Sequence, residues 1–194
     1  MAGRTRDPER MRAALLDAGL RVAERTSLGW LTLDQVVAEA KVAKGSLLHH
    51  FRDRAGYLLA LHRRFHDRLL QDIAKASDGL PPGRERLLRN ALTYLDACLR
   101  HRGVRALLLE ARAEPQIAAE VLERNAQIAR RVEPDVRALG WPDAAESARL
   151  WVAMVAEAAL VEFAAGGRRA AVRRALEHFL DAGRPRRTRL RPCR

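Results

Sequence analysis

Residues 31–51 read LTLDQVVAEAKVAKGSLLHHF and contain two short segments of helical spacing joined by a few residues. Thr32 is followed three residues later by Gln35, which is the spacing of a capping box, so a helix is predicted to begin there and end near Lys41. A second short helix is predicted at about residues 43–50. Two short helices joined by a tight turn are typical of a helix-turn-helix unit.

The composition predicts an all-α protein, and helical spacing with its breaks predicts about nine helices. The chain has 35 Ala and 29 Leu, which lose little side-chain entropy in a helix, and few β-branched residues. Asp7-Pro8 is typical of a helix start, so a first helix is predicted over residues 8–26, and Asp53 is placed to cap a long fourth helix. Beyond a predicted linker at residues 77–83, we expect helices at roughly residues 84–102, 104–113, 116–139 (with Pro134 kinking or restarting it), 143–165 and 168–182.

The charge is distributed unevenly along the chain. Of the formal net charge of +12, residues 1–77 carry +5, residues 78–183 carry +1 and residues 184–194 carry +6. A basic excess favours polyanions such as nucleic acid, although an excess of Arg over Lys is also typical of a GC-rich genome. We predict two domains, at residues 8–70 and 84–183, followed by a basic, disordered tail at residues 184–194.

Several classes of protein are disfavoured by the sequence. It contains no signal-peptide pattern and no apolar run of about 18 residues, so we expect a cytoplasmic protein without a membrane partner. Cys98 and Cys193 lack metal-type spacing, and His62 and His66 lie four residues apart without a motif that completes a site, so no metal and no cofactor are expected. No nucleophile–base set or glycine-rich phosphate loop indicates an enzyme.

The segment 31–51 resembles the N-terminal signature of the TetR family of bacterial transcriptional regulators, and the resemblance extends over about residues 8–70. Four positions depart from that pattern. Lys41 replaces the turn glycine and Ala43 replaces the serine that caps the following helix, while Val37 and Leu48 replace an alanine and a tyrosine. The matching positions are Thr32, Val36, Ala40, Val42, Lys44, Gly45, Ser46, Leu47, His50 and Phe51.

The resemblance implies a three-helix head with a helix-turn-helix, a connecting fourth helix and a C-terminal helical bundle. It also implies that the second helix of the helix-turn-helix reads DNA, although the same spacing fits an ordinary solvated helix. Gly45 costs about 1 kcal/mol relative to Ala within a helix, which makes sense where the helix approaches a nucleic-acid backbone. The implied DNA-binding residues are Thr32, Lys44, Gly45, Ser46, His49, His50 and Arg54 (the last holding a phosphate), to which Lys41 is added as a phosphate contact of this chain.

For the C-terminal bundle, the resemblance implies a dimer interface made by the last two helices and a small-molecule cavity among the central helices. A plain core or surface role explains the same residues equally well. The predicted interface residues are Trp151, Val155, Val172, Leu176 and Phe179. The predicted ligand-binding residues are Tyr94, Cys98, His101, Arg105, Arg112, Trp151 and Met154.

The sequence therefore predicts a homodimeric transcriptional repressor that a small-molecule effector releases from a near-palindromic DNA operator. Two alternatives stay open at this point. One is a DNA-binding dimer without an effector, with a nucleoid or chromosome-organising role. The other is a helical-bundle protein that binds a small molecule or a partner and carries a vestigial head.

Overall fold

The computed structural model describes residues 8–182, and this part of the chain contains nine α-helices, two short 3-10 helices and no β-strand. The predicted all-α class is confirmed, whereas the predicted tail at residues 184–194 lies outside the described residues. Within residues 8–182, no helix has the length and apolar character that crossing a membrane requires. The elements are α1 (Pro8–Ala23), η1 (Leu28–Trp30), α2 (Leu33–Ala40), α3 (Lys44–Phe51), α4 (Arg54–Ala76), α5 (Arg84–Arg100), α6 (Arg102–Glu110), η2 (Ala111–Ala113), α7 (Pro115–Ala138), α8 (Ala144–Ala164) and α9 (Ala170–Ala182).

Contacts divide the chain into two compact units. Unit 1 contains the described residues up to Asp72 together with Arg100–Leu122, and unit 2 contains Ile73–Leu99 together with the described residues from Glu123 onward. This grouping differs from the linear boundaries predicted at residues 8–70 and 84–183, because α6 and the start of α7 group with the N-terminal helices. A boundary placed at the glycines and prolines of residues 77–83 does not anticipate that a later segment packs against the N-terminal helices.

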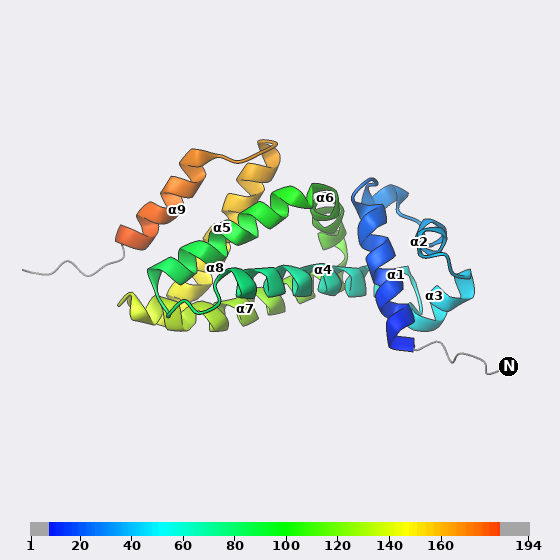
Figure 1. Cartoon of the computed structure of the whole chain (residues 1–194), viewed down its shortest axis with the longest axis horizontal. Coiled ribbons are helices and arrows are strands. Elements are labelled where there is room, and N and C mark those ends of the chain that lie inside the picture. Colours follow the sequence, from blue (N-terminus) through cyan, green and yellow to red (C-terminus); the bar gives the residue numbers. More distant parts are fainter. Residues whose placement is uncertain (1–7, 183–194) are drawn as a thin grey trace, which may run out of the picture. The chain divides into compact units, whose positions relative to one another are not determined.

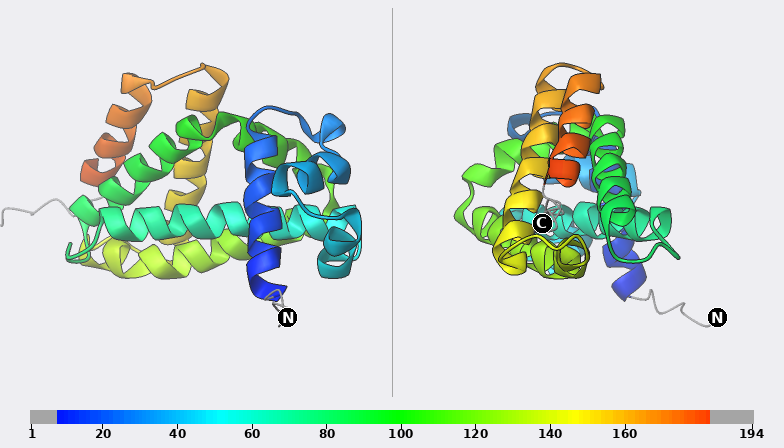
Figure 2. Two further views of the ribbon diagram at one scale, coloured as in Figure 1. Left: turned by 45° about the vertical axis from the view of Figure 1, so that its right-hand side comes forward. Right: turned by 90° about the vertical axis from the view of Figure 1, so that its left-hand side faces the viewer.

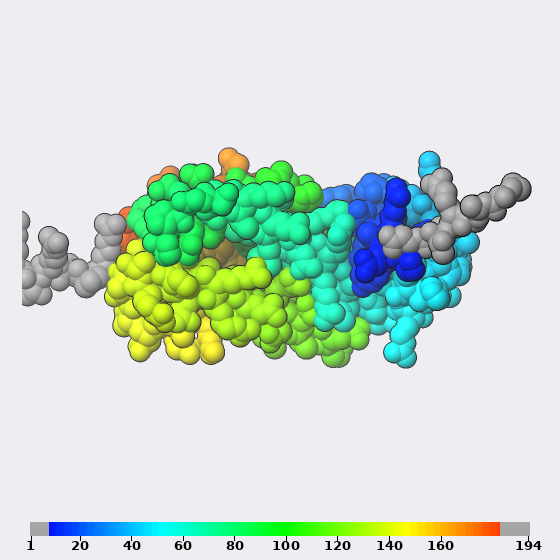
Figure 3. Space-filling view, turned by 60° about the horizontal axis from the view of Figure 1, so that its bottom comes forward, coloured from blue at the N-terminus to red at the C-terminus, as the bar shows by residue number. Residues whose placement is uncertain are grey.

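In unit 1, α1, α2, α3 and the first part of α4 enclose an apolar core (Figures 1 and 2). The buried Tyr57 hydroxyl of α4 donates a hydrogen bond to the carbonyl oxygen of Leu15 in α1 at 3.1 Å. A Cβ at Gly19 would lie 1.8 Å from the same hydroxyl, so α1 and α4 approach each other too closely for any larger residue. The two helices lie side by side at the surface as well (Figure 3).

Helix α6 packs against the end of α1. Its start differs from the one predicted from the sequence. Gly103 was expected to separate two helices, yet it lies inside α6, which begins at Arg102 and ends at Glu110. A Cβ at Gly103 would lie 2.4 Å from the Cα of Glu24. The glycine therefore permits a close approach of two backbones, and the adjacent His101 Nδ1 lies 2.9 Å from the Glu24 carboxylate.

Unit 2 contains α5, the second part of α7, α8 and α9 around one hydrophobic core. Helix α7 runs through Pro134 without ending, so the restart considered for that position does not occur. Directly after this proline, Asp135 is 1% exposed and accepts hydrogen bonds from the Gly83 amide at 2.8 Å and from Arg86 Nε at 2.7 Å and Nη2 at 3.0 Å. Asp135 thereby joins α7 to the start of α5.

A second buried carboxylate holds the α8–α9 connection. Glu162 is fully buried and accepts hydrogen bonds from the Arg169 amide at 2.9 Å and from Arg173 Nε and Nη2, both at 2.8 Å. Arg173 also pairs with Asp96 of α5 at 2.8 Å. The hydrogen bonds from Arg173 outweigh the effect of burial and hold the pKa of Glu162 below its ordinary value.

Candidate nucleic-acid interface

Helix α2 begins with the capping box that the sequence predicts. Thr32 Oγ1 accepts a hydrogen bond from the Gln35 amide at 3.2 Å, and Gln35 Oε1 accepts one from the Thr32 amide at 3.0 Å. Thr32 itself is exposed. Because its hydroxyl acts as an acceptor in the cap, the hydroxyl hydrogen is left to donate to an acceptor such as a phosphate oxygen.

The turn between α2 and α3 forms although it lacks the glycine of the family pattern. Lys41 adopts the left-handed conformation, with φ 56° and ψ 46°, and its amide donates to the carbonyl oxygen of Ala38 at 3.2 Å. This conformation costs a residue with a Cβ about 1–2 kcal/mol. The backbone geometry is thus kept at an energetic cost, and the Lys41 side chain is exposed.

Helix α3 places its apolar side chains inward and its polar side chains outward. Leu47 and Phe51 are buried in unit 1. Ala43 supplies no side-chain cap to the helix, as predicted. Of the predicted DNA-binding residues in α3, Lys44, Gly45 and His49 are exposed, whereas Ser46 and His50 are half-buried. A Cβ at Gly45 would meet no atom within 4 Å, so nothing in the protein itself requires glycine there.

Lys44 forms an ion pair that sequence analysis did not find. Its Nζ lies 2.8 Å from Oδ1 and 3.1 Å from Oδ2 of Asp34, in the first turn of α2. Both side chains are largely exposed, at 61% for Lys44 and 68% for Asp34. The two residues are ten positions apart on different helices, so only the tertiary structure reveals the pair.

An uncommon turn connects α3 to α4. Arg52 has φ 62° and ψ −56°, and the Asp53 amide donates to the carbonyl oxygen of Phe51 at 2.6 Å, which defines a γ-turn of the rare form with positive φ. Asp53 Oδ1 accepts a hydrogen bond from the Gly56 amide at 2.7 Å, so the predicted cap of the fourth helix is confirmed. Arg52 is an exposed basic residue that is absent from the predicted DNA-binding set, and the break at residues 51–53 was the available signal.

Arg54 was expected to hold a phosphate, but the structure gives it an internal partner. Its Nη2 donates to the carbonyl oxygen of Leu28 at 2.8 Å. On the other side of that residue, the Leu28 amide donates to Glu110 Oε2 at 2.9 Å, so η1 is held by α4 and by α6. Trp30, the last residue of η1, is 76% exposed.

The predicted ligand-binding residues divide between the two units. Cys98 and Trp151 belong to the core of unit 2, and Tyr94 and Met154 pack against that core. The other three, His101, Arg105 and Arg112, belong to unit 1. There His101 pairs with Glu24, and Arg105 is 2% exposed.

Most of the predicted dimer-interface residues point into unit 2. Trp151, Val155 and Leu176 are buried in its core and Val172 packs against that core, which leaves them little surface for a second chain. Phe179 is exposed. Sequence periodicity marks an apolar face but does not distinguish a core from an interface. Two further large apolar side chains are exposed on α8, those of Leu150 and Val161.

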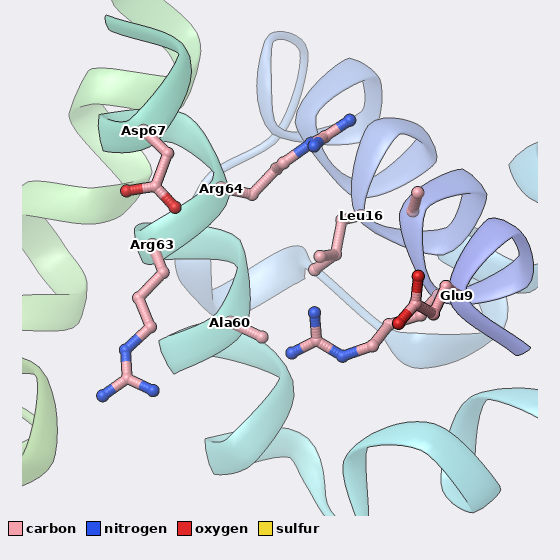
Figure 4. A pocket seen from close by; sticks show the side chains of 8 residues that line it. Glu9, Leu16, Ala60, Arg63, Arg64 and Asp67 are labelled. Carbon is pink, nitrogen blue, oxygen red and sulfur yellow. The ribbon is translucent and has the colours of Figure 1, made fainter. Parts of the chain in front are cut away.

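A shallow pocket of about 380 Å³ lies between α1 and α4 in unit 1 (Figure 4). Its arginines already have partners. Arg63 donates to Glu120 at 2.7 and 2.9 Å, Arg64 pairs with Asp17 at 3.0 Å, and the guanidinium of Arg12 lies 5.0 Å from the centre of the Phe51 ring. In Figure 4, Arg64 points toward α1 whereas Arg63 points away from it.

The histidine pair considered as a metal site is packed rather than open. His62 is buried in unit 1, and its ring centre lies 4.3 Å from that of His66. Across residues 8–182, no three His, Cys, Asp or Glu side chains are grouped so as to hold a metal ion.

These features define a class of protein: an all-helical chain with a helix-turn-helix unit near its N-terminus and a helical bundle after it. The family described as bacterial regulatory proteins, tetR family, matches residues 15–61. This match contains the whole segment 31–51, so the resemblance of that segment to the TetR family is confirmed.

Solved structures show the same fold over most of the chain. A TetR-family transcriptional regulator from Pectobacterium atrosepticum has a TM-score of 0.72 at 24% identity, covering 93% of this chain and 97% of that chain. The multidrug binding protein EbrR, complexed with imidazole, has a TM-score of 0.73 at 21% identity, covering 92% and 97%. A transcriptional regulator from Rhodococcus sp. Rha1 has a TM-score of 0.67 at 22% identity, covering 91% and 95%. No curated protein matches the chain by sequence.

Proposed function

We propose that this protein is a sequence-specific DNA-binding transcriptional regulator whose helix α3 enters the major groove. The observation that carries the proposal is the exposed side of α3. Lys44, Gly45 and His49 face solvent there, while Leu47 and Phe51 anchor the helix in unit 1. Gly45 weakens a helix by about 1 kcal/mol without any packing need inside the protein, which fits a close approach to DNA.

DNA binding is tested with fluorescently labelled duplexes from the intergenic region upstream of the protein's own gene, followed by anisotropy at several salt concentrations. We expect selective binding by the wild-type protein and at least a fivefold weaker affinity for Lys44→Ala, because a good base contact contributes about 1–3 kcal/mol. Lys75→Ala is the matched control, since Lys75 is an exposed lysine in the last turn of α4. Absence of selective binding at low salt would refute the proposal.

We further propose that the protein acts as a homodimer through α8 and α9. Leu150 and Val161 are eleven residues apart, which is three helical turns, so they share one face of α8. Together with Phe179 of α9 they expose large apolar side chains, at 71%, 40% and 51%. Two identical surfaces related by a twofold axis would cover them and would present two α3 helices to successive half-sites of a near-palindromic operator.

Oligomeric state is measured by sedimentation equilibrium. Leu150→Glu is expected to shift the protein toward monomer, because the charge would be buried in the interface. Leu122→Glu serves as the control, since Leu122 is equally exposed, at 72%, but lies on α7. A wild-type monomer at micromolar concentration, or equal behaviour of both variants, would contradict this arrangement.

The proposal also includes a repressor that a small-molecule effector releases from its operator. The likeness of the fold to EbrR, which is named a multidrug binding protein, supports it. Tyr94, Cys98, Trp151 and Met154, which lie in or against the core of unit 2, are the proposed ligand contacts. An effector changes operator affinity only if it binds two conformations of the protein unequally. A screen that adds compounds to the preformed DNA complex tests this point, and no change with any compound favours a DNA-binding dimer without an effector.

A further inference from the structure

The carboxylate of Asp34 lies where the proposed function places DNA. Asp34 occupies the first turn of α2, and Lys44 is the first residue of α3, the helix proposed to read bases. The ammonium of Lys44 contacts both oxygens of the carboxylate, at 2.8 and 3.1 Å. Because both side chains are largely exposed, the pair lies on the solvent side of these two helices.

Of the two acidic residues on α2 and α3, Asp34 is the one that pairs with Lys44. Glu39, the second acidic residue of α2, is engaged by Arg21 at 2.7 Å and by Arg25 of α1. The cationic Lys41 and Arg52 are exposed at the ends of the two helices, and His49 is exposed on α3. A surface that is otherwise basic thus carries one acidic group beside its central lysine.

We propose that Asp34 is a specificity-determining residue, which restrains Lys44 from binding phosphate and leaves it able to contact bases; this inference rests on the proposed DNA-binding function. A phosphate and the Asp34 carboxylate are both anions and compete for the same ammonium. A base acceptor such as guanine O6 or N7 is neutral, and an ammonium has three donors, so Lys44 can bind it while keeping Asp34.

This competition affects non-specific binding most. Affinity for arbitrary DNA comes almost entirely from phosphate contacts and counterion release. An ammonium neutralised by Asp34 releases few counterions, so Lys44 contributes little to that affinity in the wild-type protein. An exposed ion pair contributes little to folding, so substitution of Asp34 leaves the fold intact and changes only how Lys44 is used.

The test is a double-mutant cycle of wild type, Asp34→Asn, Lys44→Ala and the double variant. The probes are a duplex of scrambled sequence and a duplex selected from a random library by the wild-type protein. Affinities are measured by anisotropy between about 50 and 200 mM salt, the range in which phosphate contacts dominate the salt dependence. Glu146→Gln is the matched control, because Glu146 also forms an exposed pair, with Arg149 on α8, and its loss changes the net charge equally.

We expect Asp34→Asn to bind the scrambled duplex about two- to fivefold more tightly, as the release of an exposed ion pair allows, and to lose selectivity by a similar factor. Its slope of log affinity against log salt steepens by about 0.9, which is one additional phosphate contact. We expect the double variant to lose this steepening, because it lacks the lysine that would contact the phosphate. The single variant Lys44→Ala should have the same slope as wild type for scrambled DNA.

Three outcomes overturn the inference but leave the proposed function standing. The first is an equal salt slope for Asp34→Asn and Glu146→Gln, and the second is a shallower salt slope for Lys44→Ala than for wild type on scrambled DNA. The third is a loss of affinity for the selected duplex in Asp34→Asn. The last outcome would make Asp34 a base-contacting residue. If the wild-type protein binds neither duplex at low salt, the proposed function itself fails.

Discussion

Units 1 and 2 use their carboxylates in different ways. In unit 2, Asp135 and Glu162 are buried, and each accepts three hydrogen bonds that join separate helices. In unit 1, Asp34 and Glu24 form their pairs in contact with solvent. A buried pair is costly to break, whereas an exposed pair exchanges partners readily. Asp135 and Glu162 are therefore committed to folding, whereas Asp34 and Lys44 on α2 and α3 remain available to a polyanion.

The sharpest test of this contrast is Asp135→Ala. It removes the acceptor for Arg86 and for the Gly83 amide and leaves a partly buried guanidinium without its partner. We expect a loss of about 3 kcal/mol or more in the free energy of unfolding. Urea unfolding followed by circular dichroism measures it, and Asp135→Asn, which keeps the shape and one acceptor, should lose less. A loss below 1 kcal/mol would remove the basis of the comparison.

Glu162→Gln is expected to cost somewhat less, about 1–3 kcal/mol, because an amide oxygen still accepts a hydrogen bond from Arg173. The pKa of Glu162 is lowered in the folded protein from an ordinary value of 4.5. Its stabilising effect is thus complete above pH 4.5 and is lost as the pH falls through the lower, folded pKa. Melting temperatures measured from neutral to acidic pH should therefore fall less steeply for Glu162→Gln than for wild type.

In unit 1, the buried Tyr57 joins α4 to α1 by a neutral hydrogen bond. Tyr57→Phe removes the bond to the Leu15 carbonyl and should cost about 0.5–1.5 kcal/mol. Burial raises the pKa of the Tyr57 hydroxyl above its ordinary value of 10, so the group stays protonated at neutral pH. The difference in melting temperature between Tyr57→Phe and wild type should accordingly be the same at pH 6 and pH 8, unlike an ionic effect.

The smallest effect on stability is expected for Asp34→Asn. Substitutions at exposed positions usually change the free energy of unfolding by less than about 0.5 kcal/mol. The same urea experiment measures it. A larger loss would show that the Lys44–Asp34 pair supports the fold, and the contrast between the two units would then no longer hold.

Sequence reasoning succeeded where both partners of an interaction are local. The Thr32–Gln35 capping box and the Asp53 cap each span three residues, so spacing alone predicts them. Spacing does not reveal a partner that lies far away in the sequence, such as the Leu28 carbonyl that accepts a hydrogen bond from Arg54. Gly103 was misread for the same reason, because the backbone of Glu24 that explains it lies far away in the sequence.

The exposed positions of α3 could be predicted from the sequence, whereas those of α8 could not. Alternation of buried and exposed positions along α3 follows from helical spacing, so the exposure of Lys44 and His49 could be anticipated. On α8, which is apolar on most sides, spacing cannot tell the buried Trp151 from the exposed Leu150. That distinction depends on where α5, α7 and α9 pack.

The exposed Trp30 makes the molecule its own optical reporter. The chain has three tryptophans, and the other two, Trp141 and Trp151, pack edge to face in unit 2 with ring centres 6.3 Å apart. Trp30 is thus the single indole of unit 1. It is the last residue of η1, whose first residue, Leu28, is hydrogen-bonded to Arg54 and Glu110. With phenylalanine at positions 141 and 151, the remaining fluorescence would follow η1 alone, so movements of unit 1 could be timed without attaching a dye.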